Sequence, residues 1–152
     1  MNTSKINIIV VDDDSEDQMV LKESLLEVIP NFEFSTFFNG NDCLKLLKNG
    51  SQPDLIFMDL TMPFKSGLEC LREIYNENLV SDTPIIVYSR SHHLKDISSA
   101  SEFGARFFLV KPDSQKSLTL LLKHIIYLLG RSKTEQLNKS NFVVRKQKLQ
   151  VA

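Results

Sequence analysis

Short apolar runs alternate five times with patterns typical of amphipathic helices, and this alternation constrains the fold of the chain more than any other feature. The runs with strand character cover residues 6–11, 32–38, 54–58, 84–88 and 106–110. Helical spacing covers residues 15–29, 41–48, 67–76, 94–103 and 114–129. Buried strands that alternate with helices favour a parallel sheet covered on both faces. We therefore expect an α/β, doubly wound fold on a five-stranded parallel sheet.

The strong periodicity ends at Gly130, so we expect one domain over residues 1–130 and a basic tail over residues 131–152 without a separate output domain. The tail carries six Lys or Arg and one Glu, a charge of +5, which leaves −6 on the rest of the chain. A short strand or helix is expected within residues 141–151. An acidic body argues against direct nucleic-acid binding. There is no long apolar run and no metal-type cysteine spacing, so we expect a cytoplasmic protein without membrane contact.

Four of the five expected strands are followed at once by a polar or charged residue. Asp12 and Asp13 follow the first strand, Asp59 the third, Ser89 the fourth and Lys111 the fifth. In open parallel sheets, ligands bind at the carboxyl ends of the strands. We therefore expect these five side chains to share one pocket.

The residue types in this pocket suit phosphoryl chemistry. Three neighbouring carboxylates repel one another, and a hard divalent cation such as Mg²⁺ would stabilise them. Lys111 and the hydroxyl of Ser89 could bind phosphoryl oxygens, and a carboxylate can act as the nucleophile that forms an acyl phosphate. Asp14 and Asp17 lie where the first helix begins, so we interpret them as capping residues.

These motifs resemble the receiver domains of bacterial response regulators. The resemblance rests on residues 8–14, residues 54–63 with Gly67, residues 84–89, and Lys111-Pro112, in matching order and spacing. It extends over residues 5–129. It implies a chemotaxis-receiver-like domain of a two-component system with the flavodoxin-like strand order 2-1-3-4-5.

The resemblance also implies roles for individual residues. Asp59 is then the phosphoacceptor, and Lys111 contacts the phosphoryl group. Mg²⁺ or Mn²⁺ is bound by Asp13 and Asp59 directly, by Asp12 largely through water and by the backbone carbonyl of Thr61. Ser89 is the switch hydroxyl and Phe108 the aromatic switch residue, which would move inward after phosphorylation. A cis Lys111-Pro112 bond would aim the lysine into the pocket.

Three residues depart from the family pattern. Arg90 replaces the small residue that usually follows the switch hydroxyl, which would alter access to the site. Ser66 stands where Asp or Asn commonly precedes the glycine, and Phe108 lacks the phenol oxygen of a tyrosine. None of the three removes an expected catalytic group.

The implied function is a stand-alone response regulator that is not a turnover enzyme. It would receive its phosphoryl group from a sensor histidine kinase or a histidine phosphotransfer protein and act on a downstream protein target. The regulated surface would be the fourth helix, fifth strand and fifth helix, through which a homodimer or a partner could bind. On the fifth helix, Leu120, Tyr127 and Leu128 are expected to face away from the sheet, unless the tail covers them.

Two other functions are considered. A phosphorylation-independent interaction module could use the same fold, and phosphotransfer experiments would distinguish it. A haloacid-dehalogenase-type phosphatase also places acidic residues after its first strand, but it needs a further acidic pair beyond the lysine and leaves Asp59 without a role. A flavin-binding protein is disfavoured by the acidic first loop.

Overall fold

The computed structural model describes residues 5–131 and 139–146 and confirms the doubly wound α/β fold. All strands are parallel and lie in the order β2-β1-β3-β4-β5-β6. Their bounds are Ile6–Val11 (β1), Phe32–Phe37 (β2), Leu55–Met58 (β3), Ile85–Ser89 (β4), Phe107–Val110 (β5) and Val143–Val144 (β6). The first five strands have the expected order. The sheet has six strands instead of five because a segment of the C-terminal tail adds β6.

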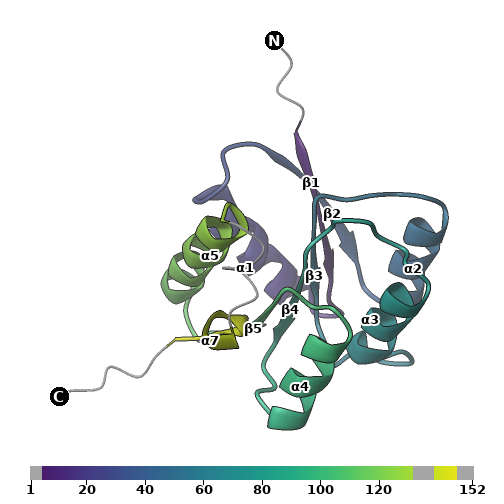
Figure 1. The fold of residues 1–152 in the computed structure, drawn as a ribbon. Helices are drawn as coiled ribbons and strands as arrows, with labels where there is room; N and C mark the ends of the chain where they lie inside the picture. The colour runs from purple at the N-terminus through teal and green to yellow at the C-terminus, as the bar shows by residue number, and fades with distance from the viewer. Residues whose placement is uncertain (1–4, 132–138, 147–152) are drawn as a thin grey trace.

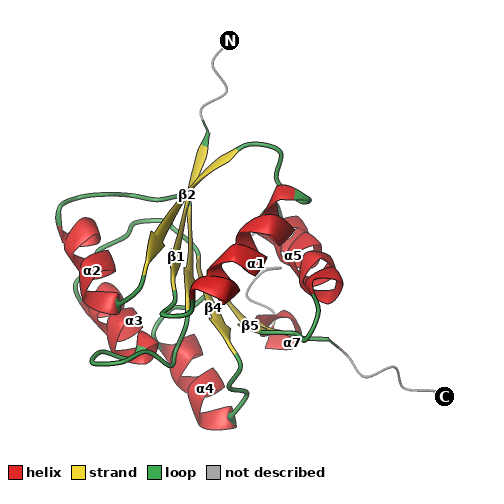
Figure 2. Ribbon diagram, turned by 180° about the vertical axis from the view of Figure 1, so that it is seen from behind, coloured by secondary structure: helices red, strands yellow, loops and turns green. Residues whose placement is uncertain are grey.

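The helices cover both faces of the sheet, as Figures 1 and 2 show. On one face lie α1 (Ser15–Leu26) and α5 (Gln115–Leu129), and on the other lie α2 (Gly40–Lys48), α3 (Gly67–Asn76) and α4 (Leu94–Glu102). Two apolar clusters fill the space on either side, because successive strand residues point to opposite faces. Phe107 and Leu109 pack towards α1 and α5, whereas Phe108 packs in the cluster of the other face.

Side chains at the helix starts explain where most helices begin. Asp14 caps α1 by accepting hydrogen bonds from the backbone N–H groups of Glu16 and Asp17, as the sequence predicts. Ser66 and Glu69 form a reciprocal capping box at α3, which gives Ser66 a structural role. Among the described residues, α4 has no side-chain hydrogen bond at its N-cap, His93, and it buries one residue, Ala100. Fewer buried side chains therefore hold α4 than hold α1, α2, α3 or α5.

The outer face of α5 differs in part from the prediction. Leu120 and Tyr127 are exposed, as expected, but Leu128 is buried. Leu121 and Leu129 of the same helix are partly buried. Leu129 lines a cavity of about 680 Å³ at the end of the helix, which explains why this position is not fully packed.

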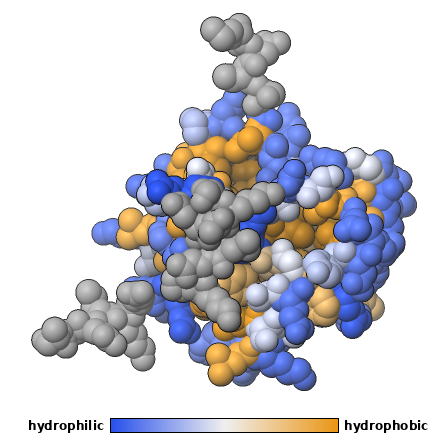
Figure 3. Space-filling model, in the orientation of Figure 1, coloured by the Kyte–Doolittle hydropathy of each residue, from blue (hydrophilic) through white to orange (hydrophobic). Residues whose placement is uncertain are grey.

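The described part of the tail forms α7 (Lys139–Phe142) and β6, which lie beside β5 (Figure 1). Val143 is aligned with Phe108 and Val144 with Leu109, and Val144 is buried. The short strand or helix expected after residue 140 is therefore present. It lies along the edge of the sheet and leaves Leu120 and Tyr127 exposed. In Figure 3, apolar residues form separate patches among hydrophilic ones on this side of the molecule.

Candidate functional site

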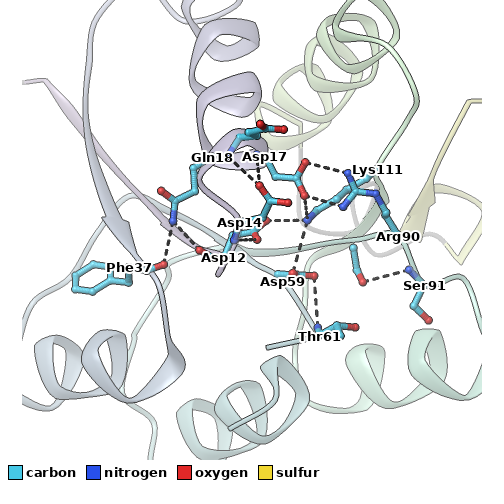
Figure 4. Close-up of polar contacts among 12 residues, drawn as sticks. Asp12, Asp14, Asp17, Gln18, Phe37, Asp59, Thr61, Arg90, Ser91 and Lys111 are labelled. Atoms are coloured by element: carbon cyan, nitrogen blue, oxygen red, sulfur yellow. Dashed lines mark hydrogen bonds and ion pairs between the residues drawn. The ribbon is translucent and has the colours of Figure 1, made fainter. Parts of the chain in front are cut away.

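The carboxyl ends of the central strands bring together the side chains that the sequence singles out. Asp12 directly follows β1, Asp59 follows β3, Ser89 is the last residue of β4, and Lys111 follows β5. All four are buried, although all are polar. Buried polar groups of this kind require partners, and the pocket supplies them from its own members (Figure 4).

The backbone around the two acidic loops is firmly held. The amide of Asp12 donates to the carbonyl of Phe37, and the side chain of Gln18 donates to the carbonyls of Asp12 (2.7 Å) and Phe37 (3.2 Å). The amide of Asp59 donates to the carbonyl of Val11 over 2.9 Å. Gln18 was not identified from the sequence, and its place one turn into α1 is the signal that could have found it.

Gly67 explains a further part of the motif. A Cβ atom at this position would overlap the backbone carbonyl oxygen of Asp59. The start of α3 therefore packs directly against the loop that carries Asp59, and a side chain at Gly67 would displace that loop.

Three carboxylates converge in the pocket. Asp12, Asp13 and Asp59 each offer one oxygen, and these oxygens all lie within 4.8 Å of one another. Burial raises the pKa of Asp59 to about 6; Lys111 opposes this rise and the Asp12 carboxylate adds to it. Burial also raises the pKa of Asp12, against the effect of its hydrogen bond with Lys111. Clustered, partly desolvated carboxylate oxygens fit a hard divalent cation, which would relieve this repulsion.

The ammonium group of Lys111 lies at the centre of the charges. Its Nζ atom is 2.7 Å from Asp12 Oδ2, 2.8 Å from Asp17 Oδ2 and 3.6 Å from Asp59 Oδ2. It also lies 4.9 Å from the centre of the Tyr88 ring. Burial by itself would lower the pKa of Lys111, but the hydrogen bonds to Asp12 and Asp17, together with the charges of Asp59 and Asp12, raise it. The lysine is therefore charged and already directed at the carboxylates.

Asp17 belongs to the site, although the sequence analysis interpreted it as a capping residue. Arg90 binds its two carboxylate oxygens with both guanidinium NH groups, over 2.7 and 3.0 Å. Burial would raise the pKa of Asp17, but the hydrogen bonds from Arg90 and Lys111 together hold it below its usual value. The position of Asp17 in the first turn of α1, directly after the acidic loop, is the signal that could have revealed its role.

The remaining predicted residues lie around this centre. The amide of Thr61 donates to Asp59 Oδ1 over 3.5 Å, which places the Thr61 backbone beside the acidic group. The hydroxyl of Ser89 accepts a hydrogen bond from the amide of Ser91 over 3.3 Å. Phe108 is fully buried in this structure, and its movement after phosphorylation stays a prediction. The predicted cis Lys111-Pro112 bond is wrong, because this bond is trans and the lysine still reaches the pocket.

Comparison with known proteins decides the family. Residues 8–123 match the response regulator receiver domain. The chain belongs to this family. The family assignment agrees with the strand order and with the acidic pocket, and it removes the support for a haloacid-dehalogenase-type phosphatase.

Individual receiver proteins are similar over most of this chain. It is 36% identical over 120 residues to the protein-glutamate methylesterase/protein-glutamine glutaminase of Halalkalibacterium halodurans, covering 77% of this chain and 33% of that protein. It is 30% identical over 126 residues to the probable transcriptional regulator ycf27 of Porphyra purpurea, covering 83% of this chain and 49% of the regulator. The chain thus spans a third to a half of these curated relatives.

Two solved receivers match almost from end to end. The phosphorylated cyanobacterial phytochrome response regulator RcpA is 26% identical, with a TM-score of 0.75, and the match covers 85% of this chain and 97% of RcpA. The Mn²⁺-bound response regulator Rcp1 is 25% identical, with a TM-score of 0.72, and the match covers 84% of this chain and 97% of Rcp1. Within the described ranges of this receiver, every helix is too short or too polar to cross a membrane.

Proposed function

We propose that this receiver takes up a phosphoryl group on Asp59 and thereby switches a protein-binding surface. The observation that carries the proposal is the convergence of Asp12, Asp13 and Asp59 within 4.8 Å, with the Lys111 ammonium 3.6 Å from Asp59. The donor would be a sensor histidine kinase or a histidine phosphotransfer protein. The phosphoryl group stays on the protein as a signal, so this chemistry is not that of a turnover enzyme.

The residues of the pocket fit an in-line transfer. An oxygen of the Asp59 carboxylate attacks the phosphorus atom of a phosphohistidine, the phosphorus–nitrogen bond breaks, and its electron pair remains on the departing imidazole. Lys111 binds one phosphoryl oxygen through its ammonium group, and the hydroxyl of Ser89 donates to another. The Lys111 ammonium lies 3.6 Å from Asp59, close to where the phosphoryl group would be bound.

The acidic cluster would hold Mg²⁺ or Mn²⁺. Asp13, Asp59 and the backbone carbonyl of Thr61 would be direct ligands, with Asp12 acting largely through water. Such an ion neutralises charge that develops on the phosphoryl oxygens.

The proposal assigns the signalling surface to α4, β5 and α5, which the exposed Leu120 and Tyr127 make suitable for a protein partner or a second copy. We place the receiver in residues 1–130 and a basic tail in residues 131–152, of which β6 joins the receiver's sheet. We place the protein in the cytoplasm, because Cys43 and Cys70 are free thiols in the described part of the chain.

Incubation with acetyl phosphate and Mg²⁺ tests the function. The mass of the protein should increase by one phosphoryl group, and Asp59→Asn or removal of the metal with a chelator should abolish the increase. A phosphorylation-independent interaction module would remain unlabelled. Equal labelling of wild type and Asp59→Asn would refute Asp59 as the acceptor.

A further inference from the structure

The Lys111 ammonium is shared between carboxylates with different functions. Its contact with Asp59 is the longest of three, at 3.6 Å, whereas Asp12 and Asp17 hold it at 2.7 and 2.8 Å. Asp12 belongs to the acidic cluster that would bind the metal ion. Asp17 lies outside that cluster, so its charge is not needed for the ion.

Arg90 binds the same Asp17 carboxylate as Lys111. The guanidinium grips both oxygens of the carboxylate, and one of these, Oδ2, is also the oxygen that accepts from Lys111 (Figure 4). The Asp17 side chain is 13% exposed, whereas that of Arg90 is 69% exposed. A partly buried anion thus contacts both a buried cation of the site and a cation at the surface.

The charges of the site determine how strongly it attracts an incoming phosphoryl group. The site contains four carboxylates, Asp12, Asp13, Asp17 and Asp59, and two cations, Lys111 and Arg90. A divalent cation would offset the remaining negative charge, and a phosphoryl group brings new negative charge. Asp17 therefore disfavours binding of the phosphoryl group in two ways. Its negative charge attracts Lys111 away from the phosphoryl group, and it repels the phosphoryl oxygens directly.

We propose that Asp17 is a positioning residue that competes with the phosphoryl group for Lys111, and that Arg90 weakens this competition by neutralising Asp17. The inference rests on phosphorylation of Asp59, as proposed above. It also gives Arg90, which departs from the usual small residue, a specific role. Arg90 acts on Lys111 through Asp17 and does not itself contact Lys111 among the described interactions.

The test is the acetyl phosphate concentration that gives half-maximal phosphorylation at fixed Mg²⁺, measured on the full chain by mass. Asp17→Asn keeps the shape of the side chain and removes its charge, so this concentration should fall about two- to fivefold, the size expected for a partly exposed ion pair. Arg90→Ala leaves Asp17 uncompensated, so the concentration should rise by a similar factor. Arg90→Lys should restore most of the wild-type value, because it retains the positive charge.

A role in folding alone predicts a different result, because both single variants break the same ion pair and should then act in the same direction. The double variant Asp17→Asn with Arg90→Ala should behave like Asp17→Asn, since Arg90 acts through Asp17. Arg90 is largely exposed, so Arg90→Ala provides a test even where Asp17→Asn folds poorly.

Shifts of both variants in the same direction, or an unchanged value for Arg90→Ala, would overturn the inference and leave the proposed function intact. An unlabelled wild type would overturn both.

Discussion

At the scale of single residues, the buried carboxylate of Asp59 lowers the free energy of unfolding. Its pKa lies near 6 in the metal-free folded protein, against an ordinary value of 3.8. Between these values the folded state binds more protons than the unfolded state, so the free energy of unfolding falls as the pH rises from about 4 to about 6. Above about pH 6, Asp59 lowers the free energy of unfolding by its full amount.

Asp59→Asn should therefore stabilise the metal-free protein at pH 7.5 by about 1–3 kcal/mol. The gain should shrink below pH 5, where the wild-type carboxyl is protonated in the fold. Urea unfolding at several pH values measures it, and Mg²⁺ should stabilise wild type more than the variant. An advantage of the variant that does not change with pH would contradict the assigned pKa.

Replacing the adjacent residues Asp13 and Asp14 with alanine should change different properties of the protein. Asp13 contributes an oxygen to the acidic cluster, whereas Asp14 caps α1. Asp13→Ala should greatly weaken Mg²⁺ binding, and Asp14→Ala should lower the free energy of unfolding by about 1 kcal/mol while largely preserving Mg²⁺ binding. Titration calorimetry and urea unfolding separate the two effects, and exchanged results would show that the two residues have the opposite roles.

At the scale of elements, β6 places a segment of the tail beside Phe108 in β5. Val143 pairs with Phe108, and Val144 packs in the cluster that contains Leu109. Phe142 also packs against the cluster of Phe108. A change in the packing around Phe108 would therefore alter the contacts of the tail as well as those of α4.

Val144→Ala tests whether β6 is part of the native sheet in solution. Val144 is 5% exposed, so losing its two methyl groups should lower the free energy of unfolding by about 1–2 kcal/mol. Val143→Ala is the matched control, because Val143 is only partly buried. Equal and negligible effects in urea unfolding would mean that β6 does not pair with β5 in solution.

At the scale of the whole molecule, phosphorylation is expected to promote association through the face of α4, β5 and α5. Leu120 and Tyr127 are 58% and 61% exposed on α5, and such apolar residues commonly mark an association surface. Sedimentation with acetyl phosphate and Mg²⁺ should show an increased mass for wild type. Leu120→Lys with Tyr127→Lys should remove the increase, and the exposed Met19→Lys on α1 is the control. An unchanged mass in every case would leave a heterologous partner as the occupant of this face.

Local signals in the sequence were sufficient to predict the alternating strands and helices and the polar residues at the strand ends. The strand order followed from the resemblance to receiver domains. Asp17 was misinterpreted because its partners, Lys111 and Arg90, lie 94 and 73 residues away along the chain. The burial of Leu128 was missed for a related reason. Helical spacing gives the direction of a side chain, but the depth of packing depends on what lies opposite at each turn.

The two-residue strand β6 also bears on the colloidal behaviour of the molecule. In a five-stranded sheet, β5 would be an outer strand, and its free N–H and C=O groups would offer a template for strands of other chains. Phe108 and Leu109 occupy the middle of β5, and β6 covers these positions. The segment thus shields this edge, and any event that detaches it would expose unpaired backbone N–H and C=O groups beside apolar side chains, which favours pairing with strands of other chains.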